Sequence, residues 1–357
     1  MPYLNIAEVE SAVTALATSY PGLTELVTLP EASVEGRTSH ALRITTDPQA
    51  RKDCVLMIGG VHAREWGSCE ILVHLAADLL EAHQGGTGLA YGGCHYTADQ
   101  VQVLLHRLDL VLFPLVNPDG RLHSQTVDPM WRKNRNPAYG GASRDPACVG
   151  VDINRNYDFL FDFATAFAPT ATPQVSASPC DPQVYAGPSA FSEPETRNVR
   201  ALLDRYPGTR WLVDVHSYSE DMLYNWGDDE NQSADPSMNF RNPAYDHTRG
   251  LPGDVTYAEY IEKTDADSAV LLAEHFCQAV AGVRGRTYKP ESGFHLYPTS
   301  GTSDDYAFAR HFVNPDRGKV LGFTVEWGTS FHPPWAEMER IVLDVDAGLV
   351  GFCLATA

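Results

Sequence analysis

The spacing of apolar residues changes along the chain between the period of helices and that of strands. Apolar positions 6, 9, 13 and 16 have helical spacing behind Asn5, a favoured N-cap, and predict an amphipathic helix at the start. Apolar or alternating runs predict strands at 23–29, 40–45, 54–58, 108–116, 211–215 and 322–326. Helical spacing recurs at 71–80, 194–206, 266–283 and 335–352. Strands that alternate with helices predict an α/β fold with a mostly parallel sheet covered on both faces.

The pattern predicts one domain across residues 1–357, because no repeat, low-complexity tract or composition break interrupts it. Residues 129–194 have little periodicity, which is typical of functional or disordered segments. Residues 228–253 are polar and contain several prolines, and we interpret them as a surface insertion. Because the insertion follows a predicted strand, it either walls a site at the end of that strand or forms a plain surface excursion.

The composition is that of a soluble globular protein, with 43% apolar and 20% charged residues. The net charge of -20 argues against nucleic acid and anionic membrane surfaces as partners. This charge serves either solubility or the attraction of cationic substrates, and composition does not choose between them. No apolar run is long enough to span a bilayer.

The cysteines are scattered without CxxC spacing. Those at 54, 69, 277 and 353 lie in apolar-periodic segments and are expected to be buried thiols, which indicates a reducing compartment. Residues 1–5 contain neither a basic n-region nor an apolar h-region, so a signal peptide is not predicted. A cytoplasmic location is therefore the expectation. A secreted chain whose signal peptide has been removed is the alternative.

Side chains of metal-binding type follow the predicted strands. The frame His62-Ala-Arg-Glu65 comes after one apolar run, and His216 ends another. Two imidazoles and a carboxylate are a ligand set of open catalytic zinc sites, with water in the fourth position. Taken alone, the HxxE frame is a weak signal, and a single histidine at a strand end is more often a hydrogen-bonded packing residue. Glu326 also ends a strand, and the carboxyl ends of strands in such sheets form sites.

Further motifs follow in an order that resembles the zinc carboxypeptidases of the carboxypeptidase A/B type, over nearly the whole chain. The matching segments are 60–66, 117–120, 131–135, 148–156, 216–219, 297–305 and 323–326. A chance fit of so many ordered motifs is negligible. The resemblance implies a single α/β domain with a mixed, mostly parallel, eight-stranded twisted sheet and helices on both faces.

By this resemblance, His62, Glu65 and His216 bind one Zn²⁺ and leave a position for water. Asp152 accepts a hydrogen bond from the second ring nitrogen of His62, which fixes the tautomer of that ring and raises its basicity. Without the resemblance, Asp152 would be interpreted as a turn residue, because its neighbours are asparagine and arginine.

The resemblance assigns catalysis to Glu326 and Arg135. Glu326 is the general base that takes a proton from the water and passes it to the leaving amine. Arg135 stabilises the developing oxyanion, because a charge-assisted donor is strong in a dry site. The residue types alone would favour an ordinary ion pair for Glu326. They would also favour a solvated place for Arg135 in the basic cluster Arg132-Lys133-Arg135.

Asn154, Arg155 and Tyr297 match the residues that bind the terminal carboxylate of a peptide. A planar guanidinium binds a carboxylate in bidentate fashion, and an amide adds a donor. An endopeptidase has no use for this trio, so the expected partner is a peptide substrate with a free C-terminal carboxylate. Arg64 and Tyr218 match secondary substrate contacts, although Arg64 is as readily an ordinary surface residue.

Asp304 falls where the family places the floor of the pocket for the departing side chain. In the family an apolar residue there accompanies apolar specificity, and Asp accompanies Lys/Arg specificity, because a buried carboxylate needs a cationic partner. Resembling bacterial enzymes with Asp there also accept apolar ends, and Thr299 and Thr302 replace smaller family residues nearby. Basic and mixed preferences therefore both stay open. Asp305 matches a structural acidic position.

The chain also departs from the family's secreted zymogens, whose N-terminal pro-segment has no room in this sequence. Cys148 and Cys180 fall near a pair that is bridged in secreted members, which conflicts with a reducing compartment. Two other functions stay open: a non-catalytic, carboxypeptidase-like binding module, and an amidohydrolase for a specialised peptide or modified amino acid. Loss of Glu326, Arg135 or a ligand would favour the first, and none is lost. The intact carboxylate-binding trio weighs against the second.

Overall fold

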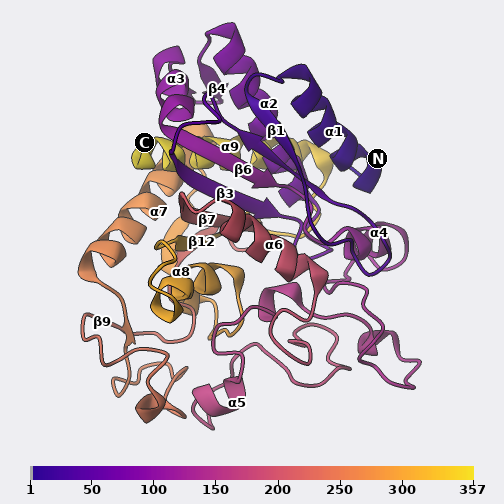
Figure 1. Ribbon diagram of the computed structural model, residues 1–357, viewed down its shortest axis with the longest axis vertical. Helices are drawn as coiled ribbons and strands as arrows, with labels where there is room; N and C mark the ends of the chain where they lie inside the picture. Colours follow the sequence, from indigo (N-terminus) through magenta and orange to yellow (C-terminus); the bar gives the residue numbers. More distant parts are fainter. Residues whose placement is uncertain (1–2) are drawn as a thin grey trace.

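The largest sheet in the described residues has eight strands and mixed direction (Figure 1). The computed structural model describes residues 3–357. Met1 and Pro2 lie outside the described residues; they belong to the segment 1–5, for which a signal peptide is not predicted. The strands in spatial order are β1 (Thr24–Thr28), β2 (His40–Ile44), β6 (Leu108–Phe113), β3 (Asp53–Gly59), β7 (Thr209–His216), β12 (Leu321–Glu326), β8 (Asp221–Tyr224) and β11 (Lys289–Ser292). The four central strands β6, β3, β7 and β12 are parallel. The expected mixed, mostly parallel sheet is confirmed.

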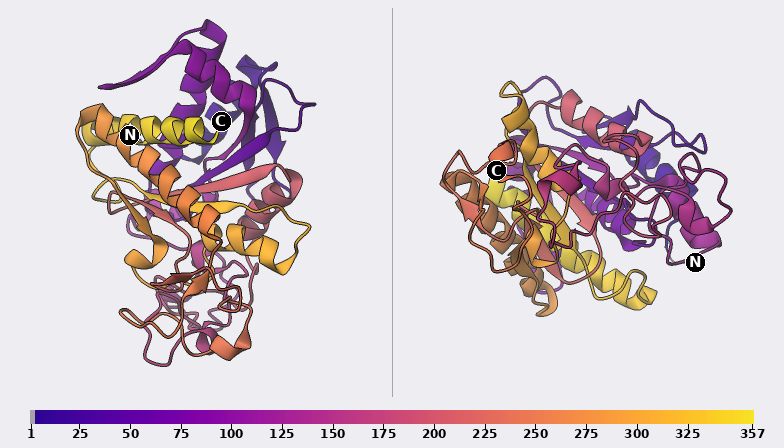
Figure 2. Two further views of the ribbon diagram at one scale, coloured as in Figure 1. Left: turned by 90° about the vertical axis from the view of Figure 1, so that its left-hand side faces the viewer. Right: turned by 90° about the horizontal axis from the view of Figure 1, so that it is seen from below.

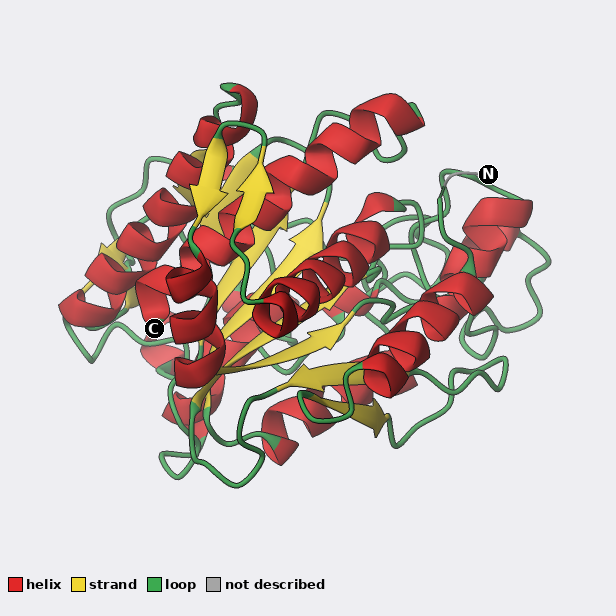
Figure 3. Cartoon of the chain, turned by 90° about the horizontal axis from the view of Figure 1, so that it is seen from above, coloured by secondary structure: helices red, strands yellow, loops and turns green. Residues whose placement is uncertain are grey.

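Helices cover both faces of this sheet, as the sequence predicts (Figures 2 and 3). On one face α2 (Gly67–Gly85), α7 (Lys263–Arg284) and α9 (Trp335–Thr356) pack together. On the other face lie α6 (Pro194–Arg205) and α8 (Ser303–Val313). Further elements are α1 (Ile6–Ser19), β4 (Leu89–Tyr91), β5 (Cys94–Tyr96), α3 (Ala98–Arg107), α4 (Pro118–Thr126), α5 (Phe163–Ala166), β9 (Gln232–Ser233) and β10 (Glu259–Tyr260).

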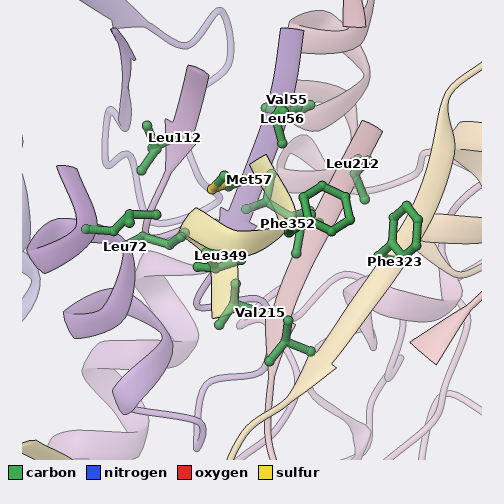
Figure 4. Packing of buried hydrophobic residues seen from close by; sticks show 14 of the residues in the cluster. Val55, Leu56, Met57, Leu72, Leu112, Leu212, Val215, Phe323, Leu349 and Phe352 are labelled. Atoms are coloured by element: carbon green, nitrogen blue, oxygen red, sulfur yellow. The ribbon is translucent and has the colours of Figure 1, made fainter. Parts of the chain in front are cut away.

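The core lies between the central strands and the helices that flank them (Figure 4). Val55, Leu56 and Met57 are consecutive residues of β3, and each is at most 1% exposed. Consecutive strand residues point to opposite faces, so β3 is buried on both of them. Leu349 and Phe352 of α9 belong to the same core. This double burial explains why the central strands are continuously apolar rather than alternating.

Local sequence sets the ends of the helices. Asn5 accepts a hydrogen bond from the backbone of Glu8, whose side chain accepts one from the backbone of Asn5; this capping box starts α1. Helix α2 ends at Gly86, whose φ of 62° favours glycine. The helix begins at Gly67, on the N-terminal side of the stretch 71–80 whose apolar spacing predicts it. A Cβ at Gly67 would overlap the end of the Met338 side chain and lie 2.9 Å from the ring of Trp327, so glycine permits the close packing of this first turn.

The segment between α4 and α6 has little regular structure and is fixed by side chains. A disulfide joins Cys148 to Cys180, 32 residues apart. The buried Lys133 donates from Nζ to the carbonyl oxygens of Ala147 and Asp181, each at 2.7 Å. The segment therefore has a defined path despite its missing periodicity, and it includes the helical turn Ile153–Arg155.

Residues 228–253 form a long loop next to that segment, at the lower end of the molecule in Figure 1. Most of the loop is partly or fully exposed, but Asp228 and Arg249 are completely buried. Nε of Arg249 lies 3.7 Å from Oδ2 of Asp228. Arg249 also forms a β-bridge with Phe167. The loop is thus anchored in the interior near both of its ends. Within residues 3–357, no helix is long and apolar enough to cross a membrane.

Candidate active site

Three adjacent parallel strands deliver the central side chains of the site. His216 is the last residue of β7 and Glu326 the last of β12, and the two are register partners. β3 lies on the other side of β7, and the short turn that follows it carries His62 and Glu65. Because carboxyl ends of parallel strands meet at one edge of the sheet, the four side chains converge there.

His62, Glu65 and His216 face one another in the arrangement of a metal-binding set. Nδ1 of His62 lies 2.8 Å from Glu65 Oε1, and Nδ1 of His216 lies 2.9 Å from Glu65 Oε2. The two Nδ1 atoms are 3.0 Å apart. All three residues are buried, at 5%, 2% and 1% exposure. The structure therefore brings together the ligands predicted from the sequence.

The second nitrogen of each ring is held by a carboxylate. Nε2 of His62 lies 3.2 Å from Asp152 Oδ1, as expected. Nε2 of His216 lies 2.9 Å from Asp214 Oδ2, which also accepts a hydrogen bond from Ser303. Asp214 was not predicted from the sequence, because it is the one polar residue of the otherwise apolar run 211–215, two positions before the histidine. Each carboxylate accepts a hydrogen bond from the ring N–H at Nε2, which leaves the lone pair of Nδ1 free to bind a metal ion.

This donor set fits a divalent cation. With the ring protons at Nε2, two nitrogen lone pairs and a carboxylate face each other across about 3 Å. Such groups repel unless a positive charge lies among them. Burial opposes ionisation of Glu65, but positive charge beside it, which protonated imidazoles of His62 and His216 supply without a metal ion, lowers its pKa below the usual range. Two imidazoles and a carboxylate with room for water suit zinc.

A cavity of about 290 Å³ opens over the metal-binding set. Its lining contains most of the residues predicted from the sequence, namely His62, Arg64, Glu65, Asn154, Arg155, Tyr218, Tyr297, Asp304 and Glu326. His216 and Asp152 are buried behind this surface. Within residues 3–357, the predicted site residue that lies apart from the cavity and its supporting carboxylates is Arg135.

The assignment of Arg135 to the oxyanion is therefore corrected. Its guanidinium lies 4.5 Å from the ring centre of Trp131, outside the cavity. Arg132, three residues earlier, lines the cavity instead and is only 8% exposed. Its Nε donates to Asp152 at 3.0 Å, so one carboxylate orients both Arg132 and His62. The basic cluster contains the right kind of residue, and the path of the backbone decides which member points inward.

Glu326 is set apart electrostatically from the other site carboxylates. Burial and the nearby negative charge of Glu65 raise the pKa of Glu326 to about 8, although His216 and Arg132 oppose this shift. Glu65, between two imidazoles, has a lowered pKa. The site therefore holds one carboxylate suited to bind a cation and one suited to take up a proton.

The trio predicted to bind a terminal carboxylate, Asn154, Arg155 and Tyr297, shares the cavity with His62 and Glu65. Arg155 is 2% exposed, and its Nη1 donates to the carbonyl oxygen of Asn154 at 2.5 Å while its Nε donates to that of Gln174. The carbon of its guanidinium lies 5.9 Å from the ring centre of Tyr297, which is 36% exposed. A fixed guanidinium next to an accessible phenol suits a small anion.

Two further predicted contacts share the mouth of the cavity. Arg64 donates to Gln183 at 2.8 Å and lies 4.1 Å above the ring of Phe331. Tyr218 packs edge-on against the same ring and is 47% exposed. Arg64 is thus part of the cavity lining rather than an ordinary surface side chain.

Asp304 and Asp305 line the cavity, and both are buried. Asp304 Oδ2 accepts a hydrogen bond from the hydroxyl of Thr324 at 2.9 Å, and Oδ1 accepts one from the amide of Asp305 at 2.9 Å. Asp305 is bound by the amide group of Asn225 and the backbone of Gly227. Burial, followed by the charges of Asp304 and Asp228, raises the pKa of Asp305 well above its usual range.

Comparison with known proteins agrees with this geometry. The family model described as "Zinc carboxypeptidase" matches residues 9–345. The chain belongs to the zinc carboxypeptidase family. A curated relative, "Carboxypeptidase B" of Helicoverpa zea, is 33% identical over 356 residues, which cover 98% of this chain and 70% of that protein.

The solved structure of carboxypeptidase A from Helicoverpa armigera shares the fold of this zinc carboxypeptidase. Its TM-score is 0.73 at 23% identity, with 99% of this chain and 74% of that chain covered. Another relative, from Talaromyces stipitatus, is named an inactive metallocarboxypeptidase. It is 30% identical over 200 residues, or 53% of this chain and 29% of that protein. The family is one of metallohydrolases that act on peptides, so the site residues decide what this zinc carboxypeptidase does.

Proposed function

We propose that this chain is a zinc-dependent exopeptidase that removes single residues from the C-termini of peptides. The observation that carries the proposal is one shared cavity: Asn154, Arg155 and Tyr297 line it together with Glu326 and two of the proposed zinc ligands, His62 and Glu65. A clamp for a carboxylate beside a metal-binding set suits a peptide whose terminal carboxylate lies one residue from the bond to be cleaved.

The chain's own groups supply binding and proton transfer. Arg155 and Asn154 bind the terminal carboxylate, and the accessible hydroxyl of Tyr297 closes over it. When bound, zinc lowers the pKa of a coordinated water and polarises the scissile carbonyl. Glu326 would take a proton from the attacking water and deliver it to the leaving amine. Arg132 donates to the carbonyl oxygen as negative charge develops there.

We propose that Asp304 gives the pocket a preference for Lys or Arg. Its two hydrogen bonds leave lone pairs on both oxygens, and Thr299 and Thr302 add polar groups to the same cavity. A guanidinium or ammonium group offers the cation that a buried carboxylate needs. The insertion 228–253 begins next to Gly227 of the lining and supplies no lining residue itself, but its Asp228 acts electrostatically on Asp305.

We also propose that the chain works in an oxidising compartment, the alternative to the cytoplasmic location expected from the sequence. The Cys148–Cys180 disulfide supports this view, because such bonds persist outside the reducing cytosol. Thiol counting on the denatured natural protein tests it. Retention of this disulfide supports the proposal, and fully reduced cysteines would refute it.

The exopeptidase proposal is tested with a matched pair of peptides, one with a free C-terminal Arg and one with the same Arg amidated. Release of a single residue from the free acid alone is expected, because Arg155 and Asn154 lack an anionic partner in the amide. The release should stop on chelation and return with zinc. Equal cleavage of the amide, or cleavage at internal bonds, would contradict the proposal.

A further inference from the structure

A second cluster of possible metal ligands lies away from the active site, between α2 and α9. His74 and Asp78 stand one turn apart on α2, so their side chains share a face of that helix. Asp346 faces them from α9, which packs on α2. Nδ1 of His74 lies 2.6 Å from Asp346 Oδ2 and 3.5 Å from Asp78 Oδ2.

The cluster has an excess of negative charge in a partly buried place. The side chain of Asp346 is 0% exposed, whereas those of Asp78 and His74 are 27% and 42% exposed. Even a protonated His74 balances only one of the two carboxylates. Asp346 Oδ1 has no hydrogen-bond partner among residues 3–357. A buried carboxylate with an open oxygen is costly unless a cation or donor satisfies it.

A second open polar group points to the same place. Tyr91 is 1% exposed, and its hydroxyl makes no hydrogen bond of good geometry in the described residues. After burial, the charges of Asp346 and Asp78 and a side-chain contact with Asp78 raise the pKa of Tyr91, so this hydroxyl lies next to Asp78 and feels the charge of Asp346. Tyr91 lies in β4, which pairs with β5. Tyr96 of β5 holds this pair of strands against α9, because its hydroxyl donates to the carbonyl oxygen of Ala347 at 2.6 Å.

We propose that His74, Asp78 and Asp346 form a second, non-catalytic site for a divalent cation of the zinc type. Their three ligand atoms all lie within 4.8 Å of one another. One imidazole and two carboxylates match the borderline preference of Zn²⁺, and a dication neutralises both acids. The half-exposed His74 leaves room for entry of the ion and for water in the fourth position. Tyr91 then donates to a ligating carboxylate from behind.

The site joins α2 to α9, two helices of the same layer. Because α2 follows directly on the turn that carries His62 and Glu65, the bound ion stabilises the support of the active site without touching the substrate. The expected effect is therefore on stability and metal content rather than on the chemical step.

The test is zinc binding by the full chain after its metal has been stripped with a chelator. The His216→Ala variant lacks a ligand of the catalytic set and should still bind one equivalent of zinc. Adding His74→Gln should remove this equivalent. Adding His275→Gln, which changes an exposed histidine of α7, should leave it in place.

Thermal unfolding provides a second readout of the same variants. Zinc should raise the unfolding temperature of His216→Ala, and the rise should vanish when His74→Gln is added. His74→Gln is a mild change at a 42% exposed side chain, and alone it should keep full peptidase activity with zinc supplied. If His216→Ala binds no zinc, or if His74→Gln leaves its zinc binding and unfolding shift unchanged, the proposal is wrong.

Discussion

Glu326 and His216 are register partners at the carboxyl ends of two adjacent parallel strands. The backbone of the sheet itself therefore sets the separation between the proposed general base and a zinc ligand. Sites on strands are held more firmly than sites on loops. Because the backbone holds each residue in place, substituting one of the two side chains tests its chemical role without displacing the other.

Arg132 and Arg135 provide a matched pair for the oxyanion assignment. Arg132→Ala should lower kcat by about 10²–10³-fold, because a charge-assisted donor to the developing negative charge is lost. Arg135→Ala should stay within a few-fold of the unchanged enzyme, since its guanidinium lies on Trp131 outside the cavity. Zinc content must be measured beside kcat, because Arg132 also orients Asp152. The reverse ranking of the two variants would return the role to Arg135.

Asp214 should act through His216 on the metal. Asp214→Ala removes the acceptor at Nε2 of His216 and should weaken zinc binding about 10–100-fold, as measured by competition with a chelator. Ser303→Ala is the control, because it removes only a second hydrogen bond to Oδ2 of Asp214 and leaves the contact between that oxygen and His216 in place. Unchanged zinc affinity in Asp214→Ala would show that this carboxylate serves packing alone.

Asp304 should set the preference for the departing residue. In the wild-type enzyme, kcat/KM should be higher for blocked dipeptides that end in Arg or Lys than for those that end in Phe or Leu. Asp304→Ile should lower kcat/KM for Arg by about 30-fold or more, because the bound cation loses its buried partner, and should favour Phe. A preference for Phe that is the same before and after the substitution would show that specificity is decided elsewhere.

Stability should depend on pH through Glu195 of α6, which is 2% exposed. Burial raises the pKa of Glu195 to about 8, from an ordinary value of 4.5. The folded state therefore holds this proton over a range in which the unfolded chain releases it. The stability that Glu195 contributes is fully present below about pH 4.5 and is lost as the pH rises through about 8.

Glu195→Gln should remove this dependence. At about 1.4 kcal/mol per pKa unit, the difference is on the order of 4 kcal/mol. Denaturant unfolding of both proteins at pH 5 and pH 9 measures this difference in the free energy of unfolding. Between pH 5 and pH 9 the variant should lose less of its free energy of unfolding than the wild-type protein. Parallel losses in the two proteins would assign the pH dependence to other buried acids.

Much of the sheet could be predicted because its central strands are buried on both faces and read as unbroken apolar runs. The last two strands of the sheet order, β8 and β11, escaped prediction, since neither Asp221–Tyr224 nor Lys289–Ser292 is a long apolar or alternating run. Their extended form depends on pairing with β12 and with each other, which is information from distant parts of the chain.

The site could be predicted where residues stand at strand ends, as His216 and Glu326 do. Arg132 and Asp214 could not be assigned, for two different physical reasons. Two arginines three positions apart on irregular backbone give no periodicity that tells which one faces inward. The role of Asp214, a single aspartate in an apolar run, becomes visible only in the structure, where its carboxylate lies beside the ring of His216.

The central claim is that Glu326 activates water at a zinc site built from three strand ends. Its most direct test is the kcat of zinc-loaded Glu326→Gln, with zinc content measured on the same sample. Glu220→Gln removes a negative charge from the adjoining turn without changing the cavity lining, and serves as the control. We expect full zinc content, near-normal KM and a fall in kcat of about 10²-fold or more. A zinc-loaded Glu326→Gln enzyme within a few-fold of the unchanged kcat would contradict the account.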